Sequence, residues 1–342
     1  MKKTLIALAV AGAAVATGVN AGELYNQDGT SLTMKGRVEG ILSLKDGDAS
    51  DKSRTRLGFL GKQEINDNLY GLGYFEGQFT SDDSASTDPA KPIDNDNGKF
   101  VSRYTYAGLG GTYGLVTYGK QDGVLTPLSD FTDIMSYHGD SSVNKLTALD
   151  RTDNLLKYAG SFDNLNVFAE YRFADRTKTG TGVNTTYTDN KQDGYGLSAT
   201  YALADIGVDL GLGYGAQDDD NQIVATVAYT LNDLYLSALY SHIDYDAAGA
   251  DNYDGYEVAA SYTIDKTKLI ATYNYGETSD TNVNNLALEV AYYFQPNFRS
   301  YVSYNINMLD KGDTYKNAAG TVTSVKDTEE QDEMVVGLRY DF

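Results

Sequence analysis

The sequence contains no cysteine and no tryptophan, and only 4 prolines and 2 histidines occur among its 342 residues. Without cysteine the chain forms no disulfide bond, so burial and backbone pairing must supply its stability. The low proline content suits long β-ladders, because proline cannot donate a ladder hydrogen bond. The sequence also lacks an apolar run of about 20 residues, the length that a membrane-spanning helix requires.

Acidic residues outnumber basic ones, with 48 Asp and Glu against 27 Lys and Arg and a formal net charge of −21. A nucleic-acid partner is therefore disfavoured, because a phosphate backbone is bound by a basic surface. The charge favours instead a surface that attracts cations. The 35 glycines and 29 tyrosines are typical of a β-rich chain.

The first 21 residues have the pattern of a secretory signal peptide. Lys2 and Lys3 form a basic start, residues 5–16 are mostly apolar, and Val19-Asn20-Ala21 provides a small-residue cleavage site. We predict cleavage after Ala21, so that residues 22–342 form an exported mature chain. Because two lysines are removed, its net charge is −23.

From residue 32 onward, apolar and polar residues alternate in runs of about ten residues. This period of two indicates β-strands, because successive side chains of a strand point to opposite faces. About 16 runs can be counted, without a linker that would divide them into domains. Short turns alternate with longer polar connections, namely residues 81–99, 175–192, 244–254, 276–285 and 310–331.

This pattern favours a membrane barrel over a soluble β-sandwich. Short turns at one end, long loops at the other and tyrosines near the strand ends are barrel features; such tyrosines include Tyr201, Tyr229, Tyr262 and Tyr292. We predict an all-β fold, a transmembrane antiparallel β-barrel of 16 strands. Residues 334–342 should pair with residues 32–44, because an open strand edge in lipid leaves backbone groups without partners.

The stretch from Gly123 to Asp150 breaks the alternation. It is long and without strand periodicity, yet it is too apolar for a disordered surface loop. Three acids, Asp130, Asp133 and Asp140, lie between its apolar residues. We predict that this third loop packs inside the barrel and that its carboxylates face an open space.

The chain resembles the general diffusion porins of Gram-negative outer membranes, and among them the OmpU-type porins. The resemblance covers the whole mature chain and is carried by residues 22–26 (GELYN), 53–59 (SRTRLGF), 103–109 (RYTYAGL), 130–140 and 337–342 (GLRYDF). It implies a homotrimer in the outer membrane, in contact with lipid and lipopolysaccharide. Tyr340 and Phe342 would form the signal for the barrel-assembly machinery. The third loop would narrow the pore opposite a ladder of arginines.

Position by position, the resemblance assigns Arg56, Arg103 and Arg151 to a basic wall and places Arg37 where the family has a lumen lysine; Arg54 shares the polar face of Arg56 and is predicted to belong to the same wall. The resemblance matches Asp133 to a constriction acid, and we predict that Asp130, Tyr137 and Asp140 of the same loop also line the constriction. Strand alternation places Lys35, Glu39 and Glu76 on the polar, inner face. Tyr137 stands where the family usually has an acid, so the charge of the constriction departs from the family pattern.

The alternation of side chains along each strand gives an independent argument that the arginines face the lumen. Arg37 and Arg56 lie on the polar faces of their strands, and Arg103 is predicted to lie opposite Tyr104 and Tyr106. An arginine facing lipid at the membrane midplane would cost about 2–4 kcal/mol, so the lumen is the favoured environment.

Other functions fit the sequence less well. A barrel hydrolase could use His138, or His242 with Asp244 or Asp246, but no Gly-x-Ser-x-Gly motif occurs. The acids of residues 218–220 lack the pattern of a calcium loop, so no metal or cofactor is expected. A sugar-specific channel would need a file of aromatic rings in the lumen, and most tyrosines are predicted to face outward. A barrel acting mainly as an adhesin stays open.

The sequence therefore predicts a non-enzymatic porin, a water-filled channel for passive diffusion of small hydrophilic solutes and ions. The acids of the outer loops should concentrate cations at the mouth, whereas the arginines oppose this at the constriction. Because the acids are in excess, weak cation selectivity is expected. The mouth acids are Asp82, Asp83, Asp218, Asp219, Asp220, Glu329 and Glu330.

Overall fold

The computed structural model describes residues 22–81, 99–247, 249–312, 314–316, 322–324 and 331–342. The predicted signal peptide and the mouth acids Asp82, Asp83, Glu329 and Glu330 lie outside the described residues.

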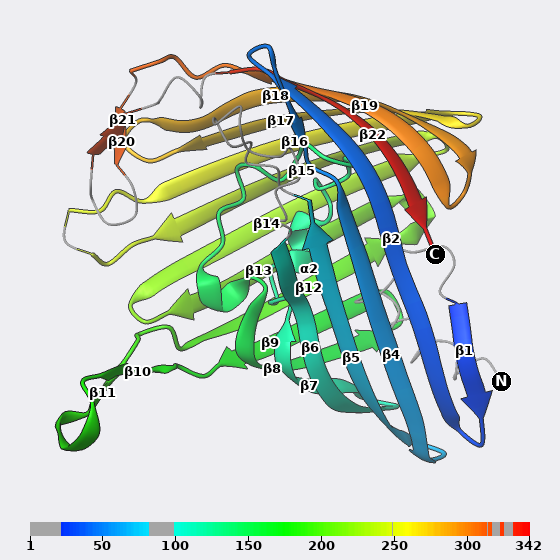
Figure 1. Cartoon of the computed structure of the whole chain (residues 1–342), viewed down its shortest axis with the longest axis vertical. Coiled ribbons are helices and arrows are strands. Elements are labelled where there is room, and N and C mark those ends of the chain that lie inside the picture. Colours follow the sequence, from blue (N-terminus) through cyan, green and yellow to red (C-terminus); the bar gives the residue numbers. More distant parts are fainter. Residues whose placement is uncertain (1–21, 82–98, 248, 313, 317–321, 325–330) are drawn as a thin grey trace, which may run out of the picture.

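Sixteen strands of the described chain form one closed antiparallel barrel (Figure 1). Each strand pairs with the next one in the sequence, and the last pairs with the first. The predicted 16-strand barrel is therefore confirmed. The strands are β2 (Thr30–Lys45), β4 (Arg54–Asn66), β5 (Leu69–Thr80), β6 (Lys99–Gly111), β7 (Gly114–Gln121), β8 (Thr152–Phe162), β9 (Leu165–Arg172), β12 (Gly194–Leu203), β13 (Val208–Gln217), β14 (Asp220–Leu231), β15 (Leu234–Asp244), β16 (Tyr253–Ile264), β17 (Thr267–Glu277), β18 (Thr281–Gln295), β19 (Phe298–Asn307) and β22 (Glu333–Asp341).

The barrel closes where β22 pairs with β2, in a register that joins Val38 to Tyr340 and Leu44 to Met334. Phe342 extends this ladder through two backbone hydrogen bonds with Gly36, of 2.8 and 2.9 Å. The short strand β1 (Gly22–Gln27) pairs with the remaining part of β2, starting opposite Met34. The predicted pairing of the two ends of the chain is confirmed, and β22 and β1 together cover the edge of β2.

Short turns connect the strands at one end of the barrel, and Asp or Asn stands in the left-handed conformation in several of them. Asp163, Asn232 and Asp265 have φ angles of 52, 52 and 51°, which these residues tolerate better than most others. Longer loops lie at the other end, with further elements in them: β3 (Asp48–Asp51), β10 (Arg176–Thr179), β11 (Thr186–Asp189), β20 (Thr314–Lys316), β21 (Val322–Ser324) and the 3-10 turn η2 (Gly182–Asn184). A further 3-10 turn, η3 (Ala204–Ile206), lies at the short-turn end.

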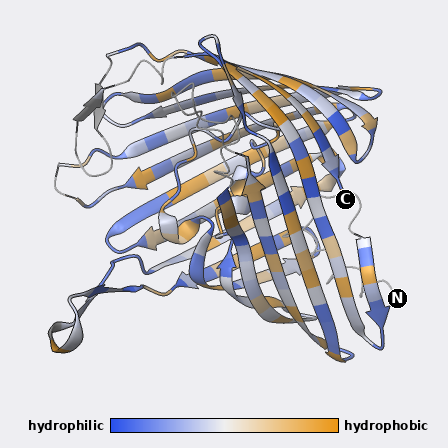
Figure 2. Cartoon of the chain, in the orientation of Figure 1, coloured by the Kyte–Doolittle hydropathy of each residue, from blue (hydrophilic) through white to orange (hydrophobic). Residues whose placement is uncertain are grey.

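The outer surface of the barrel is apolar. Along β14, Ile223, Val227 and Tyr229 are exposed on the outside, whereas Gln222 and Thr226 are buried on the inside. The alternation of colours along the strands in Figure 2 follows this pattern. Tyr201, Tyr229, Tyr262 and Tyr292 are all exposed near the short-turn end, where an interfacial tyrosine keeps its ring in the headgroup region.

The predicted orientation of Arg103 relative to its neighbours on β6 was wrong. Arg103 does not lie opposite Tyr104 and Tyr106, because a β-bulge interrupts the pairing of β5 with β6 at this point. Glu76 pairs with Tyr104 and the next residue, Gly77, pairs with Ser102, so Arg103 is the extra residue. Tyr104 and Tyr106 consequently share the inner face, where their rings lie 5.8 and 5.4 Å from that of Tyr74. The extra residue of a bulge changes the face to which the following side chains point. The alternation of residue types in the sequence does not reveal where a bulge occurs.

The third loop, L3 (residues 122–151), folds into the barrel and forms the largest apolar cluster of the described chain. Its only regular elements are α2 (Thr126–Ser129) and the 3-10 turn η1 (Thr147–Leu149). Val124, Leu125, Leu128, Val143, Leu146 and Leu149 of L3 pack against Val224, Leu239, Ile243 and Tyr253 of the wall. The predicted inward folding of this loop is confirmed. No helix among the described residues is long and apolar enough to cross a membrane.

Candidate functional site

Buried polar side chains of the strands hold L3 against the inner wall. Glu257 on β16 accepts hydrogen bonds from the Ser142 backbone N–H (3.0 Å) and the Thr132 hydroxyl (2.6 Å). Glu289 on β18 accepts one from the Ser136 backbone N–H (2.9 Å). Both glutamates are 2% exposed. Since buried polar groups need partners, these bonds fix the loop at defined points of the wall.

Glycines of β12 and β13 provide the space that the apolar side of L3 occupies. A Cβ atom at Gly213 would lie 2.6 Å from Leu125, and one at Gly215 would lie 2.4 Å from Leu149. A Cβ atom at Gly211 would lie 2.6 Å from Leu128, and one at Gly196 would lie 2.5 Å from Val124. Larger residues at these positions would displace the loop, so the alternate glycines of this wall position L3.

The three acids of L3 that were predicted to face the open space have different surroundings. Asp130 and Asp133 are exposed, and the charged residues near Asp133 are Lys145 of L3 itself and Arg37, Arg56 and Arg54 of the wall. Asp140 is half-buried, and the charged residues near it are Lys145, Glu257, Asp133 and Asp150. Only Asp133 of the three therefore combines exposure with proximity to these arginines.

Tyr137 lies at the tip of L3 and packs against the wall. Its neighbours form an apolar cluster of Ile41, Ala291, Tyr301 and Val335, on the inner face of β2, β18, β19 and β22. The substitution of an acid by a tyrosine thus gives the loop tip an apolar contact instead of a charge.

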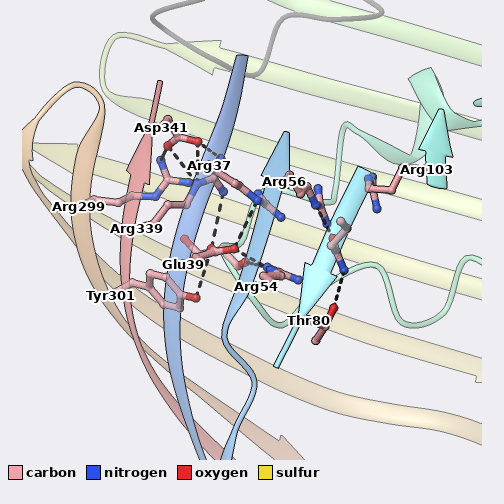
Figure 3. A network of polar contacts seen from close by, with 12 residues as sticks. Arg37, Glu39, Arg54, Arg56, Thr80, Arg103, Arg299, Tyr301, Arg339 and Asp341 are labelled. Atoms are coloured by element: carbon pink, nitrogen blue, oxygen red, sulfur yellow. Dashed lines mark hydrogen bonds and ion pairs between the residues drawn. The ribbon is translucent and has the colours of Figure 1, made fainter. Parts of the chain in front are cut away.

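The opposite wall carries the predicted arginines, together with carboxylates that pair with most of them (Figure 3). Arg54 Nε lies 2.6 Å and Arg37 Nε lies 3.4 Å from the Glu39 carboxylate. Arg103 Nε donates to Glu76 at 2.8 Å. Arg56 differs from these, because its Nε donates to the neutral side chain of Gln78 at 2.6 Å. Among the described residues, no carboxylate lies within 4.0 Å of Arg56.

Two further arginines extend this wall and were missed from the sequence. Arg339 on β22 lies 2.7 Å from Asp341 and 3.9 Å from Glu39, and Arg299 on β19 lies 3.5 Å from Asp341. The signal was present, since Arg339 and Asp341 alternate with the outward residues Leu338 and Tyr340.

Lys35 and Arg151 lie beside the tyrosines of the inner face. The Lys35 ammonium lies 5.0 Å from the ring centre of Tyr74, and the Arg151 guanidinium lies 5.8 Å from that of Tyr104. The Tyr74 hydroxyl donates to Glu76 at 2.7 Å. These cations therefore line the wall next to the arginines but contact aromatic rings as well.

The two histidines do not form an accessible catalytic site. His242 contacts Asp254 at 2.9 Å on the neighbouring strand β16, and not Asp244 or Asp246, the partners that a hydrolase could have used. His138 contacts the Ser303 hydroxyl at 2.7 Å and Glu333 at 3.3 Å. This resembles a nucleophile–base–acid chain, but Ser303 is 0% exposed beneath the loop tip. The arrangement favours a structural attachment of L3 over hydrolysis.

No group of three or more metal-ligating side chains comes together within the described part of the chain. Asp218 and Asp219 form the turn between β13 and β14, and Asp218 lies 3.2 Å from the exposed Lys191 ammonium.

The family comparison agrees with this architecture. A family model described as "Gram-negative porin" matches residues 4–312, which is most of the chain. The chain belongs to the family of Gram-negative porins, and it is an outer-membrane protein that forms a transmembrane channel.

Within that family the chain is similar to the proteins named outer membrane protein U. It is 52% identical to that of Vibrio parahaemolyticus over 343 residues, which covers 100% of both chains. The resemblance to OmpU-type porins is thereby confirmed.

Two solved structures share the fold. Salmonella typhi OmpF in complex with daunomycin has a TM-score of 0.73 at 22% identity, over 94% of this chain and 100% of that one. The trimer form of OmpT from Vibrio cholerae has a TM-score of 0.61 at 20% identity, over 92% of this chain and 100% of that one.

Proposed function

We propose that this porin forms a weakly cation-selective, water-filled channel for the passive diffusion of small hydrophilic solutes and ions. The observation that carries the proposal is the exposed carboxylate of Asp133, held on an inward-folded loop within electrostatic reach of the arginine wall. Barrels of 16–18 strands leave an aqueous channel. Carboxylates on one side of a constriction and guanidinium groups on the other create a field across the path of a solute.

The pairing within the wall supports cation selectivity. Glu39, Glu76 and Asp341 lie among the arginines and offset much of their charge. Arg56 has no such partner among the described residues, so its charge is less compensated than those of Arg37, Arg54 and Arg103. The chain as a whole has a net charge of −21. The surrounding acids therefore outweigh the cations of the constriction at low salt.

The test is the reversal potential of the purified protein in a planar bilayer under a KCl gradient. The sign should correspond to a modest preference for K⁺, and the preference should fall as the salt concentration rises, because screening shortens the range of the outer charges. A preference for Cl⁻ would overturn the proposed selectivity, and the absence of conductance would overturn the proposed channel.

We further propose a homotrimer that uses the outer face of β2, β4 and β5. Gly40, Gly61 and Gly73 leave open space between the exposed apolar side chains of this face, since a Cβ atom at any of them would meet nothing closer than 4.0 Å. Beside it an open apolar groove of about 550 Å³ runs along β2 and β22, with Leu42, Val336 and Leu338 in its lining. Small residues on an apolar face let a second barrel approach closely and favour packing in membranes.

A further inference from the structure

Glu39 lies at the seam where the barrel closes, between the strands that carry the arginines. In the strand register it stands directly opposite Arg339 on β22 and directly opposite Arg54 on β4. Its side chain is 0% exposed. A buried carboxylate between two arginine-bearing strands links the closing strand pair to the basic wall.

The contacts of Glu39 divide between its two oxygens (Figure 3). Oε2 accepts a hydrogen bond from Arg54 Nε at 2.6 Å and lies 3.4 Å from Arg37 Nε. Oε1 lies 3.9 Å from Arg339 Nη1 and accepts a hydrogen bond from the Tyr301 hydroxyl at 3.4 Å. One carboxylate thus compensates three guanidinium groups, and a charged group without such compensation would be costly to bury.

Arg54 depends on Glu39 more than Arg339 does. Arg339 has a second carboxylate, Asp341, at 2.7 Å. Among the described residues, Glu39 is the only carboxylate within ion-pair distance of Arg54. Loss of the Glu39 charge would therefore leave Arg54 beside Arg37 with repulsion and no opposing attraction.

Arg54 reaches beyond the wall to the tip of L3. Its Nη2 donates a hydrogen bond to the Ser136 carbonyl oxygen at 3.3 Å. The backbone N–H of the same residue donates to Glu289 on the far side, and the next residue, Tyr137, packs beside Ile41 and Tyr301. The tip of the loop is therefore held between β4 and β18, and Glu39 orients the arginine on one of these sides.

We propose that Glu39 is a positioning residue of the pore, which holds Arg54 against the tip of L3 and so sets the gap between the loop and the barrel seam. The inference deepens the proposed function and rests on it, because a gap at this place limits conduction only if the lumen is the pore. Without the carboxylate, Arg54 turns away from Ser136, and the loop tip loses its attachment to β4.

The experiment compares two isosteric variants that each remove one negative charge from the wall, Glu39→Gln and Glu76→Gln. Glu76 pairs with Arg103, and within the described part of the chain no hydrogen bond or ion pair joins Arg103 to the tip of L3. Both are made in a Ser136→Cys background, which is suitable because the chain contains no cysteine and the bonds from Arg54 and to Glu289, at 3.3 and 2.9 Å, use backbone atoms of Ser136 that the substitution retains. A neutral methanethiosulfonate reagent reports access to residue 136 by its modification rate, and its approach does not depend on wall charge.

Glu39→Gln should raise the modification rate about 10- to 100-fold, which corresponds to the loss of one hydrogen bond to a charged group. Glu76→Gln should leave the rate unchanged, although both variants shift the reversal potential toward Cl⁻ by a similar amount. Equal modification rates in the two variants would overturn the inference, because Glu39 would then act through its charge alone.

Arg54→Gln provides a second route if Glu39→Gln does not fold, as judged by heat-modifiable mobility in gels. It removes the donor to Ser136 directly and should raise the modification rate in the same range; an unchanged rate would overturn the inference. The Ser136→Cys parent separates the two proposals, since a parent without conductance refutes the proposed channel. A conducting parent with unresponsive variants refutes only the role of Glu39.

Discussion

At the scale of single residues, the charge of the constriction depends on which arginines have a carboxylate partner. Arg54 and Arg103 each contact one, whereas Arg56 contacts the amide of Gln78. Two unit charges at 4 Å interact with about 1 kcal/mol in water and with more near a protein surface. Asp133 and Arg56 should therefore control ion selectivity more strongly than the paired residues do.

Replacing Asp133 with Asn should weaken the K⁺ preference, and replacing Arg56 with Ala should strengthen it. We expect changes of roughly two- to fivefold in the permeability ratio at low salt, because each variant removes one charge beside the path of the ion. The measurement is the reversal potential under a KCl gradient. Shifts of opposite sign to these would contradict the assignment of the two residues to the pore.

At the scale of elements, L3 is positioned by the wall from two directions. Carboxylates such as Glu257 and Glu289 receive its backbone and hydroxyl groups, and glycines such as Gly213 leave room for its leucines. The loop is thus part of the barrel interior, in contrast to the hairpin of β10 and β11, in which every described side chain on the strands is exposed.

Deleting residues 129–139 should enlarge the channel, because this segment contains Asp130, Asp133 and the contacts of the loop tip with Arg54 and Ile41. We expect a higher single-channel conductance and a larger polymer exclusion size. The matched control is deletion of residues 176–189, the exposed hairpin of β10 and β11, which should leave both quantities unchanged. Unchanged conductance in the 129–139 deletion would mean that L3 does not narrow the pore.

The sequence predicted the strands and the inward loop because both follow from periodicity. The alternation of polar and apolar residues likewise predicted the face of the strand on which Arg37 and Arg56 lie. It failed at Arg103, where a bulge changes the parity of β6. It also missed the role of Gly211, Gly213 and Gly215, since the spacing of glycines along one strand does not tell which distant loop occupies the space.

Contacts between residues far apart in the chain are the part of the site that could not be predicted from a single sequence. The position of Glu39 between Arg54 and Arg339 results from closure of the barrel, which joins residues about 300 positions apart in the chain. The contact of His138 with Ser303 and Glu333 results instead from the inward folding of L3. Neither the register of the closing strands nor the position of the loop tip follows from alternation along one strand, and the structure supplies both.

At the scale of the whole molecule, the outer face of the barrel differs between its two sides. Leucines, valines and tyrosines cover β14–β18, as a lipid-facing surface requires. The face of β2, β4 and β5 also exposes large apolar side chains such as Val38 and Phe79, but Gly40, Gly61 and Gly73 lie among them. This asymmetry is the basis of the proposed trimer.

Replacing Gly73 with Phe should dissociate the trimer, because the ring would stand on the face where the second barrel packs. The control is Ala225→Phe on the outer face of β14, which places the same ring among lipid-facing residues. Light scattering of the detergent-solubilised protein gives the oligomeric state. A Gly73→Phe protein that stays trimeric would refute this choice of interface.

Asp133, on a loop inside the barrel, is proposed to border the path of the ions. Asp133→Cys in this cysteine-free chain can be modified during a bilayer recording with a cationic methanethiosulfonate, and Val227→Cys on the outer face of β14 serves as the control. We predict a stepwise fall in conductance and a shift of the reversal potential toward Cl⁻ for the loop variant alone. If Asp133→Cys becomes modified and the current does not change, L3 does not line the pore and the account is wrong.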